Sequence, residues 1–235
     1  MIGIIIPTYN EKENIFKLSE KLIQLYPNSK IFIVDDTKNY NLNNFFSKNK
    51  KITYIHRKNK KGRGSAVIEG FKKAIKNNKI KFFVEMDADF SHKPEELGKN
   101  LIIFKSRNLD LLVSSRYLKK SKIYNWSFQR RVFSLLANFL AKLLINVGVT
   151  DYTNGYRIYS KRALKVIVSK CGKIGDGFIV LSEILLQLKM KNFKISETPS
   201  IFVNRKRGES SVNIKLIIQS LLGLIKLYLK KINFN

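Results

Sequence analysis

Short apolar runs alternate with longer segments of helical periodicity along the first half of the chain. Five runs have the length and the residue content of buried strands: Gly3–Pro7, Lys30–Val34, Ile52–Ile55, Ile80–Met86 and Leu109–Val113. Between them, residues 11–25, 65–76 and 94–104 repeat apolar positions every three to four residues, which predicts helices. Strands that alternate with helices predict an α/β domain with a mostly parallel, Rossmann-like sheet flanked by helices.

The apolar run that ends at Met86 is followed by two carboxylates, Asp87 and Asp89, separated by one alanine. Parallel sheets place their chemistry at the ends of such strands. Residues i and i+2 of an extended chain point to the same side, roughly 6–7 Å apart, so the pair can share one hard cation. An ordinary Asx turn at a strand end uses the same residue types, so the motif alone leaves both interpretations open.

Other strand ends bring polar and aromatic side chains toward the same edge of the predicted sheet. Asn10 stands where the cap of the helix starting at Glu11 is expected, and Tyr9 offers a flat face to a nucleobase. Asp35 and Asp36 are adjacent carboxylates, which repel each other and are stabilised by hydrogen bonds from a base or a ribose. Caps and turns remain the alternative interpretation for these residues.

A glycine-rich segment, residues 60–65, follows the third predicted strand and allows the backbone to approach a ligand closely. Lys61 and Arg63 would add positive charge there. The segment lacks the spacing of a nucleotide-binding P-loop, and no GxGxxG motif follows the first strand. Both absences count against a P-loop enzyme and a dinucleotide-dependent dehydrogenase.

The formal net charge is +28, from 45 Lys and Arg against 17 Asp and Glu. Nucleic acid, an anionic membrane surface and phosphorylated ligands are suitable partners for such a charge, and a compositional bias toward Lys, Asn and Ile is the alternative. The basic residues are spread along the chain without a recognised nucleic-acid-binding motif, so we expect no nucleic-acid partner. A single cysteine, Cys171, fits a reducing compartment.

Eight motifs in order resemble those of the family 2 glycosyltransferases of GT-A fold, and more narrowly the dolichyl-phosphate mannose synthases and polyprenyl-phosphate glucosyltransferases. They are IIIPTYNEKENI (4–15), IVDDT (33–37), KGRGSA (61–66), VEMDADFSHKPEEL (84–97), SSRY (114–117), NWSFQRR (125–131), TNGYRIYS (153–160) and FVNRKRGESS (202–211). The resemblance implies a GT-A catalytic domain over residues 1–212. Residues 213–235 are expected to add a C-terminal amphipathic helix, with no transmembrane domain.

This resemblance assigns roles on the donor side of a sugar-transfer site. Asp87 and Asp89 would hold Mg²⁺ or Mn²⁺ on the diphosphate of a nucleotide sugar, with Asp89 the more direct ligand. Some relatives have Gln two residues after the second Asp, whereas this chain has Ser91, so a third protein ligand is left open. Six further residues are expected to bind the donor: Pro7, Tyr9, Glu11, Asp35, Asp36 and Lys61.

On the acceptor side, the resemblance places Arg116, Arg130 and Arg205 around a lipid phosphate, which arginine forks bind bidentately. The implied reaction is inverting transfer of a hexose, mannose from GDP-mannose, to dolichyl or polyprenyl phosphate. A UDP-sugar-dependent hexosyltransferase is the alternative, because the base-contacting residues do not separate guanine from uracil. Thr37 after the Asp pair and Ser211 after the GES motif depart from the family pattern and leave donor choice and acceptor geometry open.

Two stripes of polar residues at helical spacing run through apolar segments: Arg130, Ser134, Asn138 and Lys142, and Lys215, Gln219, Lys226 and Lys230. Each helix can pack on the domain core or lie in a bilayer interface with its lysines at the headgroups. No run reaches the roughly 20 apolar residues of a membrane span. We therefore expect a cytoplasmic protein, peripheral on the cytoplasmic face of the membrane, with a separate anchoring subunit left open.

Overall fold

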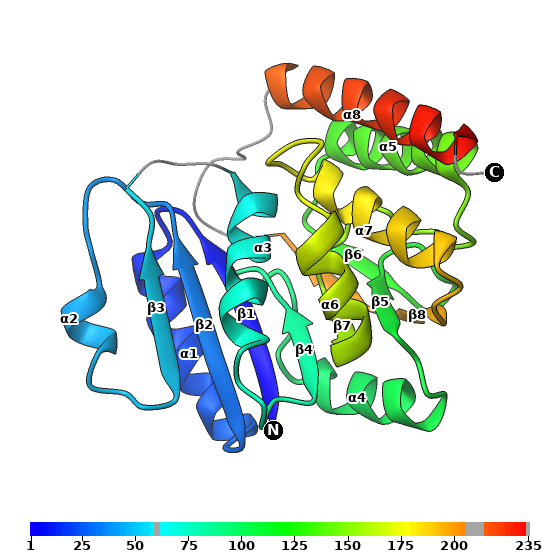
Figure 1. Cartoon of the computed structure of the whole chain (residues 1–235). Helices are drawn as coiled ribbons and strands as arrows, with labels where there is room; N and C mark the ends of the chain where they lie inside the picture. Colours follow the sequence, from blue (N-terminus) through cyan, green and yellow to red (C-terminus); the bar gives the residue numbers. More distant parts are fainter. Residues whose placement is uncertain (59–61, 205–213, 234–235) are drawn as a thin grey trace.

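The computed structural model of the chain describes residues 1–58, 62–204 and 214–233, with side chains from residue 219 onward in the last segment. Its main sheet has seven strands in the order β3-β2-β1-β4-β7-β5-β8 (Figure 1). These strands are β1 (Ile2–Thr8), β2 (Ser29–Asp35), β3 (Ile52–His56), β4 (Phe82–Glu85), β5 (Leu111–Ser115), β7 (Arg157–Ser160) and β8 (Ile195–Pro199). All five predicted strands are present, with shifted ends.

The sheet is parallel except for β7, which runs antiparallel between β4 and β5. In this register Arg157, at the start of β7, lies opposite Glu85, at the end of β4. The loop that precedes β7 therefore reaches the same sheet edge as the carboxyl ends of the parallel strands. The reversal brings the TNG motif (residues 153–155) to the edge where the predicted site lies.

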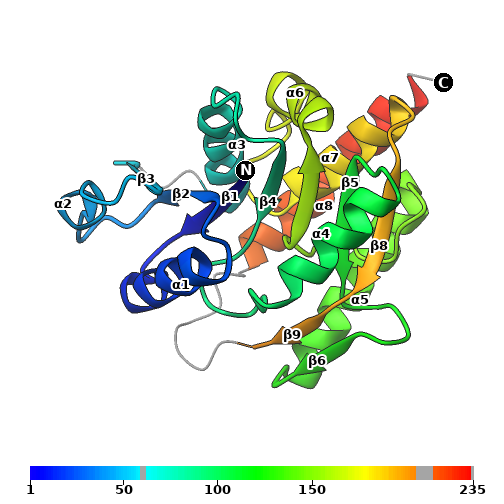
Figure 2. The same cartoon turned by 90° about the horizontal axis from the view of Figure 1, so that it is seen from below.

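Helices cover both faces of the sheet (Figures 1 and 2). The bounds are α1 (Lys12–Leu25) and α4 (Glu96–Ser106) on one face, and α3 (Arg63–Ala74), α6 (Lys161–Lys170) and α7 (Ile179–Met190) on the other. Successive residues of a strand point to opposite faces, so Ile4 and Ile6 join the core under α1 and α4 while Ile5 joins the core under α3. The short helix α2 (Asn43–Phe46) flanks β3.

Two long helices lie side by side outside this frame, α5 (Phe128–Ile145) and α8 (Ile214–Ile232) (Figure 1). Helix α8 also packs on α7, where a Cβ atom at Gly223 would lie 2.5 Å from Ile179 Cγ1. The absence of a side chain at Gly223 thus allows the close approach of the two helices. The predicted boundary between residues 212 and 213 falls outside the described residues.

A second, two-stranded ladder joins β6 (Lys122–Tyr124) to β9 (Ile201–Val203).

One prediction is wrong at the start of α1, where Asn10 does not cap the helix. Its backbone is left-handed, with φ of 58°, and its N–H donates to Thr37 Oγ1 at 2.8 Å. Asn10 is instead part of the link between the ends of β1 and β2.

Candidate active site

The carboxyl ends of β1, β2, β4 and β5 bring most of the predicted residues to one sheet edge. Thr8 pairs with Asp35 across β1 and β2, and the N–H of Asp36 donates to the Thr8 carbonyl at 3.0 Å. Asp87 and Asp89 follow β4 directly, and Tyr9, which is 40% exposed, follows β1. Parallel strand order therefore gathers side chains that are far apart in the sequence.

Asp35 and Asp36 are buried, and protein groups satisfy both carboxylates. Asp35 accepts hydrogen bonds from the Thr37 N–H at 2.9 Å and from the Tyr54 hydroxyl at 2.7 Å. Asp36 accepts two from Arg57, through Nε and Nη2, each at 2.5 Å. The pair is thus stable without a nucleoside, and its contact with a base or ribose stays a prediction.

Arg63, the first residue of α3, is turned toward two carboxylates at the end of β4. Its Nε and Nη2 donate to Asp87 Oδ1 at 2.8 and 2.6 Å, and its Nη1 donates to Glu85 Oε1 at 2.6 Å. Glu85 is fully buried, and its other oxygen accepts from the Tyr159 hydroxyl at 2.7 Å. Burial disfavours the charged form of Asp87, but the Arg63 charge, the Arg63 hydrogen bonds and further nearby positive charges together hold the pKa of Asp87 below its ordinary value.

His92 is fully buried beneath the same turn and supports it. The Asp87 N–H donates to His92 Nδ1 at 3.1 Å, so the ring proton resides on Nε2, which donates to Asn154 Oδ1 at 2.8 Å. The ring stacks on Tyr156 with centroids 5.1 Å apart. His92 therefore ties the aspartate turn to the TNG motif that the reversed strand β7 delivers.

Asp89 is partly exposed, and its Oδ1 accepts the N–H of Ser91 at 3.0 Å, which is an Asx turn. Within the described ranges no three His, Cys, Asp or Glu side chains gather into a metal-binding group. The protein can offer Asp89 and the Oδ2 atom of Asp87, which lies 3.8 Å from His92 Nε2. Mg²⁺ and Mn²⁺ in nucleotide sites use one or two carboxylates plus phosphate oxygens and water, so these residues fit such an ion.

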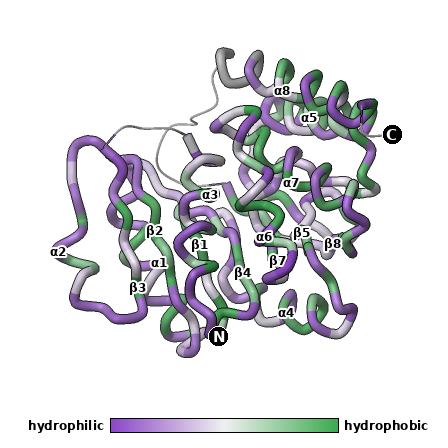
Figure 3. Tube along the Cα trace, viewed as in Figure 1, coloured by the Kyte–Doolittle hydropathy of each residue, from purple (hydrophilic) through white to green (hydrophobic). Residues whose placement is uncertain are grey.

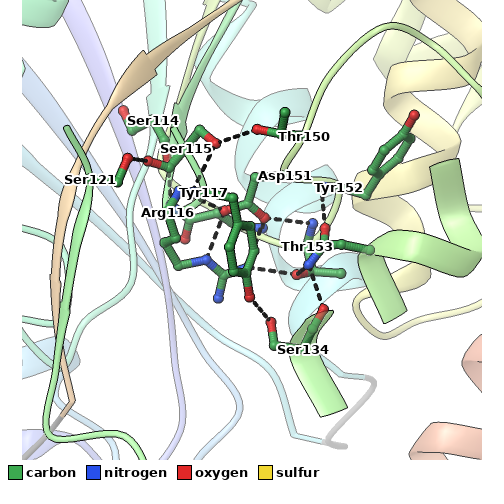
Figure 4. A network of polar contacts seen from close by, with 12 residues as sticks. Ser114, Ser115, Arg116, Tyr117, Ser121, Ser134, Thr150, Asp151, Tyr152 and Thr153 are labelled. Atoms are coloured by element: carbon green, nitrogen blue, oxygen red, sulfur yellow. Dashed lines mark hydrogen bonds and ion pairs between the residues drawn. The ribbon is translucent and has the colours of Figure 1, made fainter. Parts of the chain in front are cut away.

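A second charged centre lies just beyond β5, where Arg116 meets Asp151 (Figure 4). Arg116 Nε and Nη2 donate to the two Asp151 oxygens at 2.8 and 2.7 Å, and Nη2 also donates to Thr153 Oγ1 at 2.6 Å. Burial disfavours a charged Asp151, yet the Arg116 charge and the hydrogen bonds from Arg116 and Thr153 together hold the pKa of Asp151 below its ordinary value. Both side chains are buried, so Asp151 orients Arg116 from within the protein.

Trp126 connects Arg116 to a second predicted arginine, Arg130. The two guanidinium carbons lie 5.2 and 4.9 Å from the centre of the Trp126 ring system, and Phe202 packs edge-on against it at 5.3 Å. Arg130 Nη1 also donates to Asn204 Oδ1 at 2.6 Å. Two guanidinium groups therefore share one aromatic ring system, and their contact with an acceptor phosphate stays a prediction.

The comparison with known proteins places this geometry in a family. Residues 3–168 match the sequence profile of Glycosyl transferase family 2. The chain belongs to this family. The predicted membership is therefore confirmed, and the protein is a glycosyltransferase.

This family 2 glycosyltransferase is similar to two named mannosyltransferases. It is 32% identical over 216 residues to the polyprenol monophosphomannose synthase of Mycolicibacterium smegmatis, covering 89% of this chain and 80% of that protein. It is 29% identical over 227 residues to the undecaprenyl-phosphate mannosyltransferase of Micrococcus luteus, covering 94% of this chain and 91% of that protein.

A solved structure shows the same fold at low identity. Glucosyl-3-phosphoglycerate synthase from Mycobacterium tuberculosis, in complex with Mn²⁺, UDP-glucose and phosphoglyceric acid, has a TM-score of 0.67 and 13% identity, covering 98% of this chain and 79% of that one. The predicted GT-A-like α/β fold is confirmed. No helix in the described part of this glycosyltransferase combines the length and apolarity that crossing a membrane requires.

Sequence reasoning about the site of this glycosyltransferase has gaps. Lys61 and Arg205 were predicted to bind ligands and lie outside the described residues. Arg63 was expected to face a ligand, whereas its fork is directed at Glu85 and Asp87. Asp151 was missed, although an arginine predicted at a buried strand end needs a carboxylate partner, and an Asp just before the TNG motif is a candidate.

Proposed function

We propose that this glycosyltransferase transfers mannose from GDP-mannose to dolichyl or polyprenyl phosphate, with inversion and with a divalent cation. The observation that carries the proposal is the Arg116–Trp126–Arg130 cluster. It places two guanidinium groups on one aromatic ring system, with the Arg116 fork oriented by Asp151, at the sheet edge that also presents Asp87 and Asp89. The names of the two mannosyltransferase relatives, which align over about nine-tenths of the chain, support the same sugar and acceptor.

In this proposal an acceptor phosphate oxygen attacks the anomeric carbon from the face opposite the departing diphosphate. The new oxygen–carbon bond forms as the bond to the diphosphate breaks, and the bonding electrons leave with the nucleoside diphosphate. Arg116 and Arg130 hold and orient the acceptor phosphate. When bound at Asp89, the cation stabilises the negative charge of the leaving diphosphate.

The acceptor is already ionised at neutral pH, so the reaction needs no strong general base. This agrees with the two histidines of the chain, both of which are engaged elsewhere. His92 holds the aspartate turn, and His56 Nε2 lies 2.7 Å from the Thr37 carbonyl. Neither residue is needed to deprotonate an acceptor.

Purified protein incubated with polyprenyl phosphate is expected to form labelled mannosyl lipid from GDP-[¹⁴C]mannose. The measurement is label extracted into organic solvent, with UDP-[¹⁴C]glucose under the same conditions as the competing donor. We expect GDP-mannose to be favoured by at least about tenfold, which corresponds to about 1.4 kcal/mol of transition-state discrimination. A preference for UDP-glucose would replace the proposed donor by the UDP-sugar alternative.

We further propose that α5 and α8 hold the enzyme on the cytoplasmic face of the membrane, because α5 exposes a large apolar face in addition to the face that packs on the protein. Two polar residues of α5 face the protein: the Tyr117 hydroxyl donates a hydrogen bond to Ser134 Oγ, and the Tyr152 N–H donates one to Asn138 Oδ1. Its outer face instead carries large apolar side chains that are 52–80% exposed: Phe128, Phe133, Leu136, Phe139 and Leu143.

Helix α8 lies beside α5, and hydrophobic and hydrophilic residues alternate along both helices (Figure 3). Four of its side chains are 50–54% exposed: Leu222, Ile225, Leu229 and Ile232. An amphipathic helix with basic residues along its borders binds an anionic bilayer surface in this way. Exposed Arg131, Lys142, Lys226 and Lys230 provide such a border. The two helices thus pack on the core through one face, and their exposed apolar face supports the membrane-interface interpretation.

Replacing Phe139 and Leu143 together by Gln is expected to weaken binding to phosphatidylglycerol-containing vesicles by at least about tenfold, since burying each apolar side chain contributes roughly 1.5–3 kcal/mol. Co-sedimentation with the purified chain alone measures this and also tests whether a separate anchoring subunit is needed. Ile102→Gln is the matched control, because Ile102 is 69% exposed on α4, away from α5 and α8. Equal losses in the two variants would contradict the proposed membrane face.

A further inference from the structure

We propose that Arg63 is a positioning residue that occupies one oxygen of Asp87 and thereby weakens the binding of a divalent cation in the absence of a nucleotide. The inference rests on the cation dependence in the proposed function. It adds a residue that limits what Asp87 can offer to a cation.

The hydrogen bonds account for this limit. A carboxylate oxygen has about two acceptor positions, and two Arg63 N–H groups point at Asp87 Oδ1, at 2.8 and 2.6 Å. That oxygen has no acceptor position left for a cation. Asp87 can therefore offer a cation only its Oδ2 atom.

The Arg63 charge acts in the same direction. Only 15% of the Arg63 side chain and 27% of the Asp87 side chain are exposed, so solvent screens their charges incompletely. A guanidinium this close repels a divalent cation that approaches Asp87. The same charge favours a diphosphate anion. The site should thus bind the cation weakly alone and better together with the nucleotide.

Several groups hold Arg63 in this position, so a cation must compete with them to displace it. Glu85, which is fully buried, requires its charge. Phe178 lies 5.6 Å below the guanidinium carbon. At Gly155 in the TNG motif, a Cβ atom would lie only 1.9 Å from Arg63 Nη2. The missing side chain at Gly155 therefore creates the space that the guanidinium fills.

Gly155→Ala tests the proposal without removing a charge. Gly155 does not have a left-handed backbone, so alanine is tolerated there, and its methyl group must displace Arg63 from Asp87. Isothermal titration with MnCl₂ alone is expected to give a dissociation constant about three- to tenfold lower than that of the wild type. Titration with GDP alone is expected to show weaker binding. A purely structural defect would weaken both.

Arg63→Gln should likewise bind Mn²⁺ more tightly and GDP more weakly than the wild type. The Arg63→Gln, Glu85→Gln double variant removes the risk that an unpaired buried Glu85 prevents folding. Arg162→Gln is the matched control. Arg162 forms a similar fork with Asp110, which precedes β5 and so lies at the opposite sheet edge, and its loss should leave Mn²⁺ binding unchanged.

The role of Arg63 would be overturned if Mn²⁺ binding were unchanged, weaker or absent in folded Gly155→Ala and in the folded double variant. These titrations contain no sugar donor and no lipid. Tighter Mn²⁺ binding in these variants, in an enzyme that fails to make mannosyl lipid, would therefore reject the proposed donor and acceptor while leaving the inference about Arg63 intact.

Discussion

Asp89→Asn is expected to reduce sugar transfer by on the order of 10²–10³-fold while leaving the melting temperature close to that of the wild type. Asparagine keeps the oxygen that accepts the Ser91 N–H, so the turn after β4 is preserved. It removes the negative charge that would hold the cation at the diphosphate. Initial rates with labelled donor, together with thermal melting, measure the two effects separately.

Chelation provides the independent comparison for this variant. EDTA should abolish wild-type activity, and added Mn²⁺ should restore it, whereas Asp89→Asn should recover little even at high Mn²⁺. Asp87→Asn should behave differently, because it also removes a partner of Arg63 and should therefore lower the melting temperature. Activity that is indifferent to both EDTA and Asp89→Asn would exclude the cation-dependent mechanism.

Asp151→Asn is expected to lower the free energy of unfolding by about 3–5 kcal/mol, because it leaves the buried Arg116 charge without its carboxylate. Transfer should also fall sharply, since the guanidinium loses the partner that orients it. Urea denaturation followed by circular dichroism gives the stability, and the labelled-lipid assay gives the activity.

A double variant separates the two consequences. Asp151→Asn combined with Arg116→Met removes both buried charges and keeps an oxygen for the N–H groups of Thr153 and Asn154. It should regain most of the lost stability and remain inactive, because the acceptor phosphate lacks an arginine. If the free energy of unfolding of Asp151→Asn lay within about 1 kcal/mol of the wild-type value, Arg116 and Asp151 would not form the buried ion pair described above.

The sheet edge that carries the site is predictable from the sequence because it depends on local patterns. Apolar runs locate the strands, and parallel strand order then places Asp35, Asp87 and Asp89 at the same edge. The reversed direction of β7 is not encoded in any short pattern. The antiparallel strand Arg157–Ser160 has only four residues, with Arg and Ser at its ends, and its packing between β4 and β5 decides its direction.

The partners within the site are harder to predict because they join distant residues. Asp151 is 35 positions from Arg116, and Asp87 is 24 positions from Arg63, so neither pair has a periodicity to reveal it. Helix α5 shows a related limit. The spacing of Ser134 and Asn138 identifies a polar stripe, but only the tertiary contacts show that this stripe faces inward.

The chain contains a single tryptophan, Trp126, and the structure places it between Arg116 and Arg130. Emission excited at the red edge of the indole absorption band therefore comes from one place in the molecule. That place is the proposed acceptor pocket. The natural protein thus carries its own fluorescent reporter of acceptor binding, with no label to introduce and no second indole to subtract.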